Sequence, residues 1–223
     1  MKKRKRLYPR RARALRRAAL ALAMLLFCNF VLHIGLPLPI QALRYAEQSE
    51  GVYERTRVVM KRWEPGMMHL IDALYLAEGE NTLSLFCASP GVYGWMGGFV
   101  WPVDTTDGGD VQAGAVNMSR DGREDAVVFY GRVKGTEAVD LTADVLSEEW
   151  TDAEDGPRSY VYEYEIGEED RRVRDGYTYF IFVEPDPVPE EKQRFPRAYR
   201  ILVNRGEERI AYDFGPTASV YWG

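Results

Sequence analysis

Cysteine and histidine are scarce in this 223-residue sequence, which contains two of each. The cysteines, Cys28 and Cys87, are too few for a disulfide framework or for a zinc site built from several cysteines. His33 lies in an apolar run, so His69 is the one candidate base for a Ser-His or Cys-His site, and no GxSxG motif accompanies it. The sequence also lacks a phosphate-binding loop, a dinucleotide-binding fingerprint and a CxxC pair. No recognisable catalytic constellation is present, so a non-enzymatic protein is favoured.

Acidic side chains are missing from residues 1–17, which contain ten Lys or Arg. The rest of the chain holds 19 basic and 34 acidic side chains, a net charge of -15. This asymmetry predicts a basic tail in one compartment and an acidic domain in another. The acidic domain would repel phosphate, so no nucleic-acid partner is expected.

Charged residues are also missing from Ala18–Leu36, an apolar run between the two parts. As a helix this run is roughly 28 Å long, close to the hydrocarbon thickness of a bilayer. We therefore predict a single-pass transmembrane signal anchor over 18–40, contacting the membrane through residues 18–36. The basic tail would be cytoplasmic and the C-terminal domain extracytoplasmic. The alternative is a signal peptide cleaved after Ala42, which would release a secreted domain.

Two-residue alternation of apolar and polar side chains dominates the remainder of the chain. Residues 41–51 read as a juxtamembrane linker with a short helix that Gly51 ends. The fold class predicted for the remainder is an all-β, extracytoplasmic β-sandwich, with a β-rich part over 52–122 and an immunoglobulin-like part over 123–223. Whether 52–122 is a subdomain of its own stays open. Strands are expected over 74–76, 83–87, 126–133, 139–145, 160–166, 177–183, 198–203 and 209–214, with Cys87 in the core and a further strand over 219–222. The segment 177–183 is apolar on both faces, as a strand covered on both sides would be. Turn-forming residues at 78–81 and 204–206 predict hairpins.

Aromatic residues gather beside glycines in the segment 92–103. Tyr93, Trp95, Phe99 and Trp101 could form an exposed surface that stacks on sugars or anchors a protein partner. The alternative is that they pack in the core, where glycines allow close approach of the backbone.

Carboxylates are dense in the segment that follows, where Asp104, Asp107 and Asp110 could bind Ca²⁺ through an oxygen-rich loop. The EF-hand pattern fails, however, because Ala115 stands where its final glutamate belongs. Turn formation explains the same composition. No other cofactor is indicated.

Taken together, the sequence predicts a membrane-anchored, non-enzymatic binding or accessory module at the cell envelope. Its partner would be an envelope protein or a glycan. The alternative is an extracytoplasmic hydrolase that uses paired carboxylates, with calcium at Asp104, Asp107 and Asp110.

Overall fold

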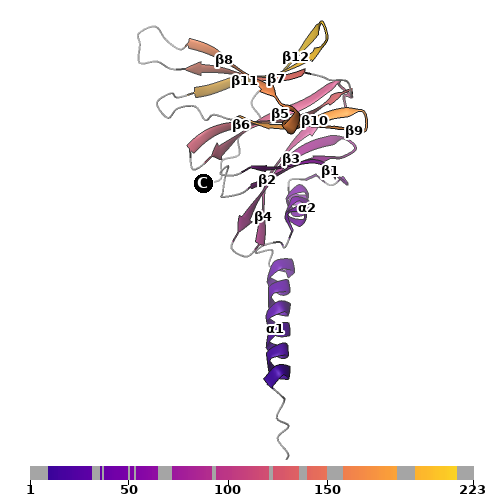
Figure 1. Cartoon of the computed structure of the whole chain (residues 1–223), viewed down its shortest axis with the longest axis vertical. Helices are drawn as coiled ribbons and strands as arrows, with labels where there is room; N and C mark the ends of the chain where they lie inside the picture. Colours follow the sequence, from indigo (N-terminus) through magenta and orange to yellow (C-terminus); the bar gives the residue numbers. More distant parts are fainter. Residues whose placement is uncertain are drawn as a thin grey trace, which may run out of the picture.

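A computed structural model of the chain is built mostly of antiparallel strands, which confirms the all-β prediction. Three four-stranded sheets are stacked, and a short helix covers one end of the stack (Figure 1). The structure describes residues 10–31, 36, 38–49, 51–52, 54–64, 72–91, 94–120, 123–135, 140–149, 158–184 and 194–214.

The first helix, α1 (Arg10–Val31), extends away from the β-sheets (Figure 1). It begins in the basic run and continues into the apolar one. Its large apolar side chains are exposed from Leu15 to Phe27. Among the described residues, no helix is both long and apolar enough to cross a bilayer.

The second helix, α2 (Pro39–Ser49), matches the short helix predicted after the apolar run. The helix ends at Ser49, and Gly51 beyond it has a φ of 80°, which a residue without a side chain adopts most easily. Ala42, Leu43 and Ala46 are buried against the nearest sheet. Full burial of a side chain such as Leu43 contributes about 1.5–3 kcal/mol to folding.

The sheet beneath α2, here called sheet 1, is a meander in which each strand pairs with the next. The predicted hairpin around residues 78–81 connects its second and third strands. Its strands are β1 (Arg57–Glu64), β2 (Asp72–Glu78), β3 (Thr82–Gly91) and β4 (Gly94–Asp104).

Sheet 2 lies next in the stack, in the order β5-β6-β10-β9. The β5–β6 hairpin links the two predicted parts of the chain. The short 3-10 helix η1 (Glu168–Asp170) leads into β9. The strands of sheet 2 are β5 (Val111–Arg120), β6 (Arg123–Lys134), β9 (Arg171–Arg174) and β10 (Tyr177–Val183).

Sheet 3 is the layer farthest from α1 (Figure 1), in the order β12-β11-β7-β8. The hairpin predicted at residues 204–206 is confirmed, with Gly206 at a φ of 64°. The strands of sheet 3 are β7 (Asp140–Glu149), β8 (Arg158–Ile166), β11 (Arg194–Arg205) and β12 (Glu208–Phe214).

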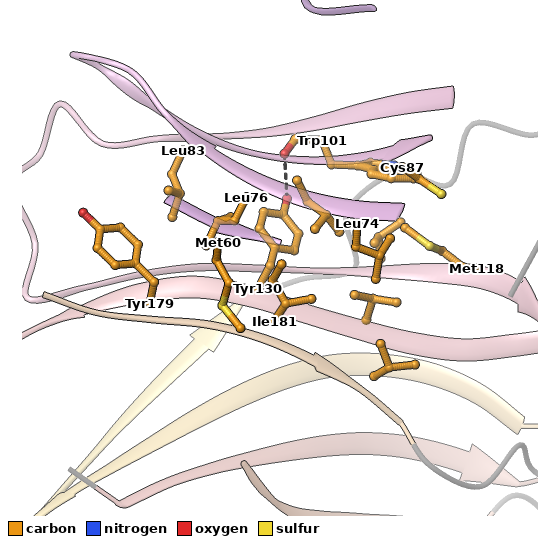
Figure 2. Close-up of a cluster of buried hydrophobic side chains, with 14 of the residues drawn as sticks. Met60, Leu74, Leu76, Leu83, Cys87, Trp101, Met118, Tyr130, Tyr179 and Ile181 are labelled. Carbon is orange, nitrogen blue, oxygen red and sulfur yellow. Dashed lines mark hydrogen bonds between the residues drawn. The ribbon is translucent and has the colours of Figure 1, made fainter. Parts of the chain in front are cut away.

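Two apolar cores lie between the three sheets. The core between sheets 1 and 2 (Figure 2) joins Leu74, Leu76 and Leu83 to Tyr130 and Ile181. As predicted, Cys87 is buried there.

The core between sheets 2 and 3 contains Phe129, Phe180 and Phe182, with Tyr199 edge-on to Phe129. Successive residues of β10 alternate between the two cores, which confirms the prediction that this strand is covered on both faces.

The chain from β6 to β12 forms strands at all the predicted places that the structure describes in that part. Those strands belong to two packed sheets, as in a sandwich. The finer immunoglobulin-like assignment stays a prediction. A strand at the extreme C-terminus, over 219–222, falls outside the described residues.

Candidate binding surface

The structure divides the aromatic residues predicted to form one surface. Phe99 and Trp101 face sheet 2, where their ring centroids are 5.7 Å apart and Trp101 is 7% exposed. Trp95 packs on the opposite face of sheet 1, beside α2. Tyr93 lies outside the described residues. Trp101 is therefore a core residue, and of the described residues in this set only Trp95 lies on the α2 face.

A β-bulge explains this division. The register of β3 and β4 shifts between Phe86 and Ala88, so the alternation of β4 changes face beyond Gly97. Gly98 lies at the bulge, where a Cβ atom would come within 2.4 Å of the Cys87 carbonyl oxygen. Strict two-residue alternation would have placed Trp95, Phe99 and Trp101 on one face.

Trp95 instead contacts Trp63, at the far edge of the same sheet. Their ring centroids are 5.6 Å apart, and the rings are tilted by 52°. The cross-strand row from Trp63 runs through Ala73 and Ala88 to Gly97. Because these residues are small, the two indole rings can meet above the strands between them.

Trp95 also forms backbone hydrogen bonds with Leu36, which follows α1 in the sequence. Its backbone N–H donates to the Leu36 carbonyl at 2.7 Å, and the Leu36 N–H donates to the Trp95 carbonyl at 2.9 Å. The two bonds form an isolated antiparallel bridge. This end of sheet 1 is therefore held beside Leu36.

A lysine lies over the exposed tryptophan. The Lys61 ammonium nitrogen is 3.8 Å from the Trp63 ring centroid and 5.3 Å from that of Tyr75. Such a cation–π contact contributes about 0.5–1 kcal/mol at an exposed site. It also covers one face of the Trp63 ring.

We call the end of sheet 1 nearest α1 the basal surface and define it by Leu38, Lys61, Trp63, Trp95 and Met96. Trp63 is 49% exposed, Met96 45% and Leu38 53%, whereas Trp95 is half-buried. β4 and α2 lie beside the upper end of α1 (Figure 1). The basal surface thus presents aromatic and aliphatic groups with one ammonium group.

Of the three predicted calcium ligands, Asp104 is the last residue of β4, and Asp107 and Asp110 lie in the turn that leads to β5. Asp104 accepts a hydrogen bond from the Thr106 N–H at 2.8 Å, and Asp107 accepts one from the Gly109 N–H at 3.1 Å. These bonds to the ionised forms lower the pKa of both carboxyls. Asp110 lies 4.0 Å from the charged groups of Lys134 and Arg205.

In the structure these carboxylates take part in the turn and in the ion pairs around it, and calcium binding stays a prediction. Across the part of the chain that the structure describes, no group of three or more His, Cys, Asp or Glu side chains is arranged to hold a metal ion.

Away from this exposed turn, two buried carboxylates meet at one arginine. The Arg62 Nε is 2.9 Å from a Glu64 carboxylate oxygen, and an Nη of Arg62 contacts Asp170 on η1. Burial raises the pKa of Asp170, while the Arg62 charge opposes that rise. The guanidinium between the two carboxylates connects sheet 1 to sheet 2, as a structural ion pair does.

A second polar network crosses the same interface. Arg132 on β6 and the hydroxyl of Tyr179 both donate to Oε1 of Glu78, the latter at 2.8 Å. Arg132 also lies over the Tyr177 ring and donates to Gln112 at 2.5 Å. Burial, reinforced by the Glu78 carboxylate, raises the pKa of Tyr179. The partly buried charges of Arg132 and Glu78 are paired, which offsets the cost of their desolvation.

Trp63 and Lys61 had not been singled out from the sequence. Their alternation on β1 shows that they share a face, but only the sheet order brings that face to Trp95. No known protein family, curated protein or solved structure matches the chain.

Proposed function

We propose that this protein is a non-enzymatic binding or accessory module, held at a cell-envelope membrane by residues 18–36. Its stacked sheets would lie on the extracytoplasmic side. We also propose an immunoglobulin-like fold for 123–223. The two packed sheets formed between β6 and β12 support this assignment.

The observation that carries the membrane proposal is the exposure of the apolar side chains of α1. Leu22, Met24 and Phe27 are each more than half exposed on a helix that extends away from the sheets (Figure 1). When many apolar side chains are exposed to water in one place, that place is usually a site of contact with a membrane or with another protein. Ten basic residues immediately before the apolar run favour a membrane and set its orientation.

The experiment that tests the anchor is alkaline carbonate extraction of membranes from cells that express the full chain. We expect the wild type to stay in the membrane pellet. Replacing Leu22 and Leu26 together by arginine should release it, because charges are costly in hydrocarbon. The matched control is Leu15→Arg, within the basic run. Release of the wild type, or an intact mass that begins at Leu43, would contradict the anchor.

In-cell crosslinking of the full chain, followed by mass spectrometry, tests the accessory role. We expect one envelope protein to be recovered in near-stoichiometric amount. If no protein is enriched while the chain remains in the membrane, a protein-accessory role is wrong and glycans become the ligands to screen.

A further inference from the structure

We infer that the basal surface lies in the lipid headgroup layer, with Trp63, Trp95 and Met96 inserted at the membrane interface. This inference rests on the proposed membrane anchor and names what the candidate binding surface contacts. If it holds, the stacked sheets are not freely tethered to the membrane but contact the bilayer in a defined orientation.

The first argument is continuity with the apolar run. Leu36 is the last residue of the apolar run 18–36 and would therefore lie near the edge of the hydrocarbon layer. Its backbone forms two hydrogen bonds with Trp95, at 2.7 and 2.9 Å. A chain can extend by at most ~18 Å from Val31 to Leu36. Trp95 therefore cannot be far from the membrane if the run is inserted.

The second argument is the chemistry of the exposed groups. Tryptophan has an apolar ring and one N–H donor, so it is favoured where hydrocarbon meets headgroups. At the same end of the sheet, Leu38 and Met96 add exposed aliphatic side chains, Met96 on the face opposite Trp95. The Lys61 ammonium could reach lipid phosphate while its methylene chain stays against the Trp63 ring.

The third argument separates lipid from a glycan. A sugar stacks on an open aromatic face. Lys61 lies over one face of Trp63, and Trp95 is tilted against the same ring. Insertion of the ring edge between lipid headgroups requires no open face. The arrangement thus favours lipid.

The net charge of the chain beyond residue 17 affects which lipids the basal surface contacts. The chain beyond residue 17 has a net charge of -15, so an anionic headgroup layer would repel most of it. The basal surface would therefore bind by aromatic and aliphatic insertion into a zwitterionic interface. Added salt should change its position little.

The test uses the full chain reconstituted in phosphatidylcholine vesicles whose acyl chains are brominated near the headgroup end. Bromine quenches tryptophan fluorescence on contact. We expect quenching of the wild type to fall by about half or more in a Trp63→Phe/Trp95→Phe variant, because interfacial indoles lie closest to the bromine. The control Trp101→Phe should keep the wild-type quenching, since Trp101 is buried between the sheets.

Vesicle flotation separates the two proposals. If the chain floats with the vesicles but the double variant is quenched as strongly as the wild type, the basal surface is not at the interface and only this inference fails. If the wild type does not float, the membrane anchor itself is wrong. If the wild type floats with the vesicles and its quenching is lost in the double variant, both proposals are supported.

Discussion

The Tyr130 hydroxyl donates a hydrogen bond of 3.0 Å to the main-chain carbonyl of Trp101 (Figure 2). The bond crosses the core between sheet 2 and sheet 1, and burial raises the pKa of the Tyr130 phenol. Space for the ring depends on Gly114, where a Cβ atom would lie 2.6 Å from the tyrosine ring. Tyr130 therefore packs its ring in the core between sheets 1 and 2, and its buried hydroxyl has a hydrogen-bond partner there.

Replacing Tyr130 by phenylalanine should lower the free energy of unfolding by about 1 kcal/mol, the ordinary net value of one hydrogen bond. The measurement is urea denaturation of the full chain in detergent, followed by circular dichroism. The matched control is Tyr177→Phe, which keeps its ring against Arg132. Equal stability of the Tyr130 variant and the wild type would show that this bond contributes nothing.

The two kinds of tryptophan should respond differently to truncation. Trp101→Ala removes a core ring and should destabilise the protein by about 3–5 kcal/mol. Trp63→Ala removes a half-exposed ring and its contact with Lys61, which should cost about 1 kcal/mol or less. Thermal denaturation of both variants provides the comparison. A larger loss of stability for Trp63→Ala than for Trp101→Ala would contradict the placement of Trp101 in the core between the sheets.

A methyl group at Gly98 should strain the bulge of β4. Its Cβ atom would lie 2.4 Å from the Cys87 carbonyl oxygen, so the strands must separate locally. We expect Gly98→Ala to destabilise the fold by about 1–3 kcal/mol. In the matched control, Gly109→Ala, the nearest atom is a side-chain oxygen at 3.4 Å, and unfolding should change little. A wild-type melting temperature for Gly98→Ala would mean that the backbone does not approach so closely.

Asp144 should make stability depend on pH. It is 2% exposed, and its Oδ1 has no hydrogen-bond partner within the described part of the chain. Burial, followed by the nearby Glu163 charge, raises its pKa, although Arg200 and Arg209 oppose that rise. Since the folded-state pKa exceeds the unfolded value of about 3.9, ionisation favours unfolding.

Asp144→Asn should therefore be more stable than the wild type at neutral pH. The difference should shrink as pH falls through the folded-state pKa toward the unfolded value. Urea midpoints measured across this range test the sign. The exposed Asp140→Asn, on the same strand, should change stability by at most about 0.5 kcal/mol. An Asp144→Asn variant that loses stability at neutral pH would mean that attraction to the arginines outweighs burial.

Much of the secondary structure was predictable because its causes are local. The apolar letters of 177–183 predicted a strand covered on both faces, and β10 has that environment. Glycine at the 204–206 turn predicted the last hairpin, and Gly51 predicted the end of α2. β1 and β5 were not located in the same way. In β5, Ala113, Gly114 and Ala115 give too little contrast between the two faces.

The candidate surface was less predictable because it depends on contacts between distant residues. Trp95 was singled out by its aromatic neighbours, but Trp63 lies on another strand, and its contact with Trp95 depends on the sheet order. The aspartates of 104–110 could be read as ligands or as a turn. Their hydrogen bonds to backbone N–H groups show the turn.

The sequence by itself determined the charge asymmetry, the uncharged run, the all-β class and many of the strands, since each depends on composition or on the periodicity of neighbouring residues. Only the tertiary structure decided that three sheets stack, that a bulge turns Trp101 into the core, and that Trp63 meets Trp95 beside the end of the apolar run. Those features depend on which strands become neighbours and where their register shifts, and residues close in sequence do not specify either.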